Sequence, residues 1–149
     1  MREILFRGKS MDNGEWVNGS LIHAGDYCCI LEDEEKLHPH CWPYLDSECG
    51  TFDGYATPVD PFTVGQFTGL YDRNGKRIFE GDILRCCLGD KIDIGVVQYD
   101  DRIAAFIVLF TDGVLTFLDF FTAKVETWYE VIGNIHDNPE LLEEGEDDD

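Results

Sequence analysis

The chain has 149 residues, of which 44% are hydrophobic and 13% aromatic, which is typical of a globular protein rather than a disordered one. Its 31 acids against 11 Lys and Arg give a net charge of −20, which repels nucleic-acid backbones and anionic membranes. Six of the acids lie in residues 143–149, a tail that we expect to be disordered, so −14 remains on residues 1–142. The composition therefore argues against direct nucleic-acid binding.

The N-terminal residues, MREILFRGKS, carry charges at positions 2, 3 and 7 and no long apolar run. They predict neither a secretion signal nor a membrane anchor, so we expect a cytoplasmic protein. Thiols stay reduced in the cytosol, and the six cysteines are therefore expected to be free.

Alternating apolar residues and turn signals predict a mainly β chain. In the N-terminal part, the Asn-Gly pairs at 13–14 and 18–19 each predict a tight reversal between strands. The strands expected there are 2–7, 15–17, 20–23 and 27–31. The stretch 37–63 holds four prolines and several aromatic residues, and it is expected to be a long ordered loop.

Further strands are expected at 64–70, 77–87, 94–99, 103–110, 114–121 and 126–135. Asn138 followed by Pro139 predicts one short helix near 138–144, because Asn caps a helix and Pro suits its first position. A shift in composition near Thr63 divides the chain into an N-terminal β-lobe with the aromatic loop (1–63), a small β-barrel region (64–142) and the acidic tail (143–149).

The stretch QFTGLYDRNGKRIFEGDILR at 66–85 is the strongest local pattern. Asp72, Asn74 and Gly75 occupy the positions that a type I turn with a following left-handed glycine requires. The stretch lacks the acids of a calcium loop and the glycines of a phosphate loop. Gly81 permits a sharp bend, and Asp82 is placed to accept backbone N–H bonds across that corner. We interpret all five as structural turn residues.

His38, His40, Cys41 and Cys49 are residue types that bind zinc. Their spacing matches no finger or ribbon, so we expect an ordinary loop and no cofactor. No nucleophile and base form a recognisable motif, so no catalytic residue is predicted and the protein is not expected to be an enzyme. The aromatic residues alone do not make a base-stacking surface, because the cations that such a surface needs are missing.

Three segments, QFTGLYDRNG (66–75), IFEGDI (78–83) and EVIGNIHDNPELL (130–142), together with the opening MREILFR, resemble the YopX family. Residues 23–63 do not carry the pattern. The resemblance implies a protein encoded by bacteriophages and prophages, and hence located in a bacterial host cell. It also implies an all-β fold with an SH3-like small barrel in the C-terminal part, and no assigned catalytic residues.

The stretch from Ile103 to Phe110 is apolar on both faces of its predicted strand, whereas a half-exposed strand alternates apolar and polar residues. The second face must be covered, either by the N-terminal lobe or by another subunit. We expect a homo-oligomer, with interface candidates Ile103, Phe106, Val108, Phe110 and Phe117.

Two hypotheses on function follow. The first is a non-enzymatic, self-associating module that binds a host or phage protein. The second is an acidic mimic of DNA that inhibits a host nucleic-acid-binding protein, motivated by the net charge of −20.

Overall fold

The computed structural model describes residues 3–32, 56–119 and 127–143, and this part of the chain is mainly β-strand, as predicted. It divides into two compact units, residues 1–66 and 67–149. Outside the described residues lie the zinc-ligand candidates His38, His40, Cys41 and Cys49, and the acidic tail from residue 144 onward.

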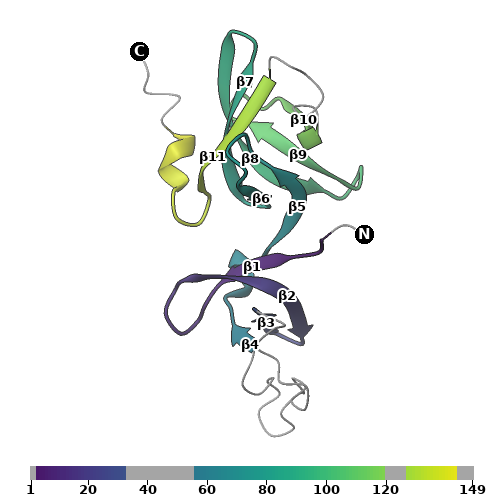
Figure 1. Cartoon of the computed structure of the whole chain (residues 1–149), viewed down its shortest axis with the longest axis vertical. Helices are drawn as coiled ribbons and strands as arrows, with labels where there is room; N and C mark the ends of the chain where they lie inside the picture. The colour runs from purple at the N-terminus through teal and green to yellow at the C-terminus, as the bar shows by residue number, and fades with distance from the viewer. Residues whose placement is uncertain (1–2, 33–55, 120–126, 144–149) are drawn as a thin grey trace, which may run out of the picture. The chain divides into compact units, whose positions relative to one another are not determined.

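The first unit is an antiparallel sheet with the strand order β4-β3-β2-β1-β5 (Figure 1). Its buried core consists of Cys28, Ile30 and Val59. A short 3₁₀ helix, η2 (Pro61–Thr63), leads into β5. The strands are β1 (Phe6–Lys9), β2 (Trp16–Ala24), β3 (Tyr27–Leu31), β4 (Ala56–Pro58) and the start of β5 (Gly65–Tyr71). Strand β4 and helix η2 lie at the end of the stretch expected to be a loop.

The turn predicted at Asn18-Gly19 is wrong, because both residues lie in the middle of the nine-residue strand β2. They pair there with Arg7 and Phe6 of β1. Gly19 is needed for another reason: a Cβ at this position would overlap the backbone carbonyl of Leu31 on β3. The Asn13-Gly14 turn is confirmed, and Gly14 has a φ of 73°. The glycine at position 19 thus serves close packing between strands rather than a reversal.

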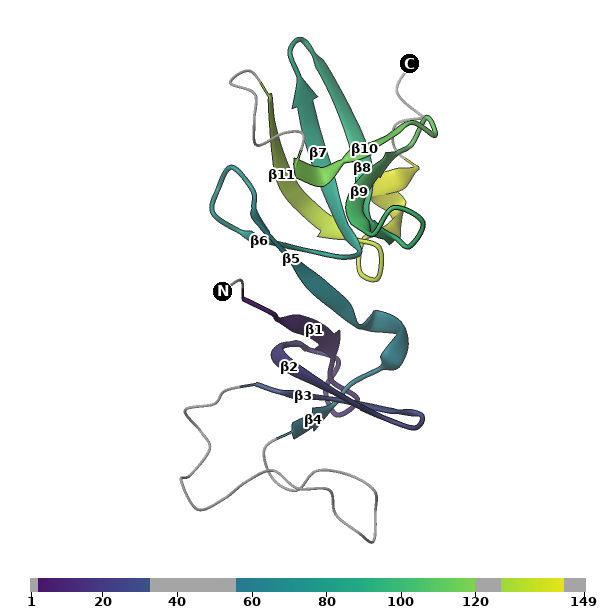
Figure 2. The ribbon, with the colours of Figure 1, turned by 90° about the vertical axis from the view of Figure 1, so that its right-hand side faces the viewer.

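The second unit contains a five-stranded antiparallel sheet with the order β10-β9-β8-β7-β11 (Figure 2). Its core includes Ile78, Leu84, Cys86, Val97 and Val108. The rest of β5 enters this unit and pairs with β6. The strands are β6 (Arg77–Phe79), β7 (Asp82–Leu88), β8 (Lys91–Asp100), β9 (Ala105–Phe110), β10 (Leu115–Phe117) and β11 (Thr127–Asn134). The predicted strand 77–87 is split at Glu80-Gly81. Of the predicted strand 114–121, the structure describes residues 114–119, and within these β10 is the strand.

The described strands of this unit form an open sheet, in which β10 and β11 stand at opposite ends of the strand order. The short helix predicted near 138–144 is a single 3₁₀ segment, η4 (Pro139–Leu142). Its expected cap is not formed, because the Asn138 side chain makes no hydrogen bond to the helix. The side-chain oxygen of Asn138 instead accepts a hydrogen bond from the backbone N–H of Asn134 at 3.3 Å.

Candidate functional site on the outer face of the five-stranded sheet

Strand β9 presents apolar side chains on both faces of the sheet. Its side chains alternate between the two faces because strand residues have a period of two. Val108 (0% exposed) and Phe110 (5%) point into the core, and Phe106 packs against that core. Three of the five interface candidates therefore face inward, and Val108 and Phe110 are not available for a contact with another subunit.

The opposite, outer face of this strand carries Ala105, Ile107 and Leu109. Antiparallel pairing places each beside residues of the neighbouring strands. Leu109 stands between Val96 of β8 and Leu115 of β10. In the next row, Ile107 stands between Gln98 of β8 and Phe117 of β10. We call these two rows the outer-face patch: Val96, Gln98, Ile107, Leu109, Leu115 and Phe117. None of its six side chains is charged.

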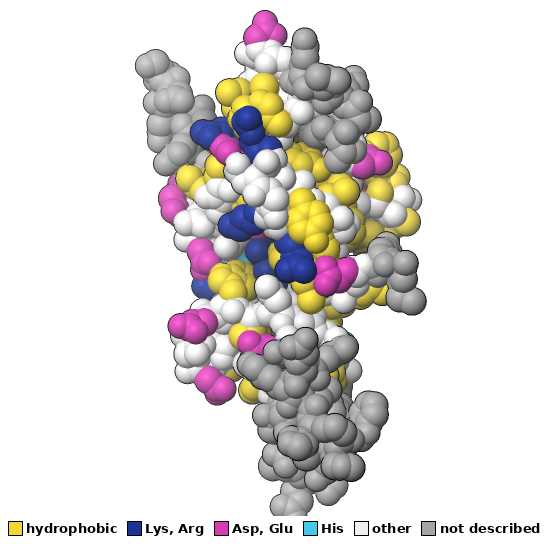
Figure 3. Space-filling model, viewed as in Figure 1, with side chains coloured by type: hydrophobic (Ala, Val, Ile, Leu, Met, Phe, Trp, Pro, Cys, Tyr) yellow, Lys and Arg dark blue, Asp and Glu magenta, His cyan; other side chains and the backbone are white. Residues whose placement is uncertain are grey.

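The patch is exposed mainly along the edge strand β10. Phe117 is 53% exposed and Leu115 is 46% exposed. Ile103, another interface candidate, is 46% exposed but lies in the turn between β8 and β9. Hydrophobic side chains are visible at the right-hand edge of the second unit in Figure 3, on the side where β9 and β10 lie in Figure 1.

A hollow of about 410 Å³ opens on this face. Ile107, Leu109 and Leu115 form its apolar part, and Gln98, Asp100 and Arg102 contribute its polar rim. The Arg102 side chain donates hydrogen bonds to Asp100 at 3.1 and 3.2 Å, and these hold the pKa of the Asp100 carboxyl below its ordinary value. The lining combines apolar side chains with the Asp100–Arg102 ion pair and the carboxylate of Asp101 at the rim, and its apolar part suits the binding of an apolar group.

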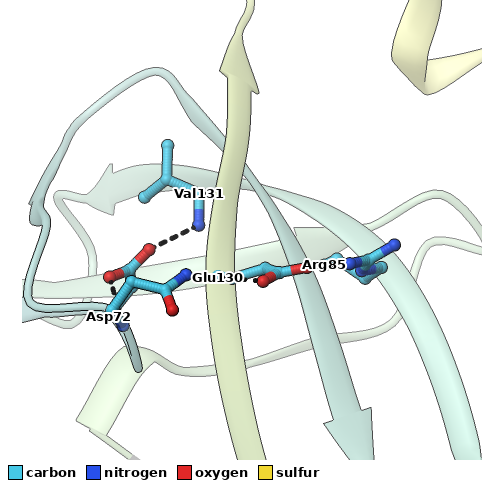
Figure 4. Close-up of polar contacts among 5 residues, drawn as sticks. Asp72, Arg85, Glu130 and Val131 are labelled. Atoms are coloured by element: carbon cyan, nitrogen blue, oxygen red, sulfur yellow. Dashed lines mark hydrogen bonds and ion pairs between the residues drawn. The ribbon is translucent and has the colours of Figure 1, made fainter.

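The turn at Asp72 has a structural role, as the sequence predicts. Oδ1 of Asp72 accepts hydrogen bonds from the backbone N–H groups of Asn74 (2.9 Å) and Lys76 (2.8 Å), and Gly75 has a φ of 81°. Oδ2 accepts a third bond from the N–H of Val131, 59 residues away, at 2.9 Å (Figure 4). Because β11 pairs with β7 on its other side, this carboxylate covers a free edge of the sheet.

The corner at Gly81-Asp82 has the same kind of role. Gly81 has a φ of 88°, which few residues other than glycine adopt. The buried Asp82 carboxylate accepts a hydrogen bond from the backbone N–H of Phe79 at 2.8 Å. The expected contact across the corner is thus formed, and the residues at this corner organise the backbone.

Sequence reasoning missed a group of side chains on the outer side of β11. The Arg73 guanidinium lies 4.1 Å from the centre of the Trp128 ring, and Arg85 forms an ion pair with Glu130 (Figure 4). The pairing of Glu130 with Arg85 follows from strand register, and the Arg73 stack follows from the position of the turn against β11. One face of Trp128 is therefore already in contact with a cation.

The described residues contain no group of three or more His, Cys, Asp or Glu that could hold a metal ion. Within the same ranges, no helix is long and apolar enough to cross a membrane. The four described cysteines are free and buried, in agreement with the expectation for these four. Burial, with a smaller contribution from Asp93, raises the pKa of Cys86 to about 12.

Comparisons with known proteins extend over both units. The model of the family described as YopX protein matches residues 5–143. The crystal structure of protein EF1440 from Enterococcus faecalis is similar to the chain, with 26% sequence identity and a TM-score of 0.59, and the match covers 95% of this chain and 99% of that one. No curated protein sequence matches. Since the family model covers most of the chain, the protein belongs to the YopX family.

Proposed function

We propose that the protein is a non-enzymatic, self-associating interaction module, encoded by a phage or prophage and acting in the cytoplasm of the bacterial host. The observation that carries this proposal is the exposed apolar edge of the outer-face patch, where Leu115 is 46% and Phe117 is 53% exposed on a chain with a net charge of −20. Exposed apolar side chains that lie together mark a site of association. The phage origin rests on the resemblance to the YopX family.

We also infer that the second unit is a partly open, SH3-like small barrel. Four consecutive strands, β7 to β10, form a meander, and β11 returns to pair with β7. Side chains from these strands meet in one core, which includes Leu84, Val97, Val108 and Tyr129. When a curved sheet packs one face around its own core, its opposite, outer face is free to contact a partner.

The mass of the protein in solution tests self-association. The chain has a mass of 17.0 kDa, so light scattering at micromolar concentration should report a multiple of this value. An apolar contact between two acidic chains should become stronger as salt is raised, because salt screens their repulsion. A mass of one chain at every concentration and salt level would contradict the proposal.

The net charge of −20 supports a second candidate, an acidic mimic of DNA that occupies the basic groove of a host protein. Such a complex depends on opposite charges, so salt should weaken it, whereas salt should strengthen the apolar self-association. Binding to a basic DNA-binding protein, measured at low and high salt beside the light-scattering series, separates the two.

A further inference from the structure

We infer that the hollow on the outer face receives Phe117 from a second copy of the chain, with the two copies related by a two-fold axis. This inference rests on the proposed function and specifies its contact. The protruding and the receiving part lie on the same face: Phe117 is the register partner of Ile107, which lines the hollow.

The hollow is not filled by the Phe117 of its own chain. Phe117 borders a different hollow of about 440 Å³, together with Leu70, Phe106 and Leu118. The outer-face hollow of about 410 Å³ is therefore open to a side chain from outside, and its apolar floor includes Ile107, which is 4% exposed. Insertion of an aromatic ring would remove apolar surface from water on both partners.

The self-complementarity of this face favours a second copy as the occupant. A two-fold contact uses the same surface twice, so a face that carries both a protruding ring and a hollow is complementary to itself. The net charge of −20 on each chain opposes association, and the six uncharged side chains of the outer-face patch add no further like charge at the contact.

Two charged variants, studied first alone and then mixed, test this contact. Phe117→Lys places a cation on the protruding side, and Gln98→Asp places an anion in the hollow, at an exposed position. Each variant alone should dimerise more weakly than the wild type, on the order of tenfold or more, since a charge buried without a partner opposes association. Mixed in equal amounts, the two should form a heterodimer, because one contact is then native and the other joins Lys to Asp.

Ile92→Lys is the matched control. Ile92 is 56% exposed and lies on the same strand as Gln98, roughly 20 Å away at 3.3 Å per residue, so this variant should dimerise as the wild type does. Sedimentation velocity and light scattering give the masses, and circular dichroism with thermal melting confirms that each variant is folded.

The outcomes separate the inference from the proposed function. Recovery of dimers only in the mixture supports the two-fold contact. If the wild type associates and the two variants associate equally well, or if both variants are monomeric and the mixture stays monomeric, the contact inferred here is wrong while self-association stands. If the wild type is monomeric throughout, self-association itself fails, and the inference fails with it.

Discussion

The carboxylate of Asp72 accepts hydrogen bonds from three backbone N–H groups, two in its own turn and one on β11. The residue is 7% exposed and its three bonds are part-buried, so water replaces these bonds only incompletely if the side chain is removed. A buried donor that loses its acceptor costs more free energy than the bond contributes on average. Asp72 is thus a point at which a local turn and a distant strand are held together.

We predict that Asp72→Ala lowers the free energy of unfolding by about 2–4 kcal/mol, since three donors lose a charged acceptor. Asp112→Ala is the control, because Asp112 is an exposed turn residue that accepts one bond, from the N–H of Val114 at 3.0 Å. Its cost should stay below about 1 kcal/mol. Urea unfolding of both variants at neutral pH measures the difference, and equal effects would show that the additional bonds from Lys76 and from Val131 on β11 contribute nothing.

Tyr129 lies in the core of the second unit at 4% exposure. Burial raises the pKa of its phenol to about 12, and negative charge at Cys86, Asp119 and Asp72 contributes further. In the unfolded chain a tyrosine ionises near pH 10. Between about pH 10 and pH 12 the unfolded state therefore loses a proton that the folded state keeps. Stability from this residue is complete below pH 10 and is lost as the pH rises through 12.

A spectrophotometric titration of tyrosinate tests this expectation. The Tyr129 phenol should ionise in a late step, near pH 12. Tyr129→Phe should remove this late step. If the late step remains in the Tyr129→Phe variant, the phenol is not shielded as described.

At the scale of elements, β2 depends on a glycine for contact with β3. A side chain at Gly19 would overlap the backbone of Leu31, and backbone atoms in a paired strand have little room to move. Gly14, in the β1–β2 turn, has open space around its Cα and requires glycine only through its positive φ of 73°. A substitution at Gly19 therefore tests steric overlap, whereas a substitution at Gly14 tests backbone strain.

We predict that Gly19→Ala disrupts the pairing of β2 with β3, at a cost above about 3 kcal/mol, which is at the upper end for single substitutions. Gly14→Ala should cost about 1–2 kcal/mol, the strain of a left-handed backbone. Hydrogen exchange of the amides in β2 and β3 measures the effect within the first unit. Similar protection in both variants would mean that the strands shift apart easily at Gly19.

At the scale of the whole molecule, the net charge of −20 opposes compactness, because like charges are brought closer together by folding. We predict that the melting temperature rises when sodium chloride is raised from low to physiological concentration, where the Debye length falls to about 8 Å. Potassium chloride at the same ionic strength is the control for specific ion binding. A melting temperature that is independent of salt would show that the acids are spaced widely enough not to interact.

Local sequence determined the features that depend on a few neighbouring residues. Asn13-Gly14 and Asp72 to Gly75 form their predicted turns because positive φ angles and side-chain acceptors act within four or five residues. The corner at Gly81-Asp82 forms for the same reason. Composition determined the mainly β character and the excess of negative charge, and the order of three segments indicated the family.

Tertiary structure decided what depends on residues distant in the chain. Asn18-Gly19 has the sequence of a turn, but pairing with β1 and close packing against β3 keep it extended. The sequence of β9 is apolar on both faces, and only the packing of the sheet places Val108 and Phe110 in the core cluster and places Leu109 and Ile107, which is itself only 4% exposed, on the outer face. Local propensity is the same for both faces, so burial against the other strands, which is the larger free energy, determines the choice.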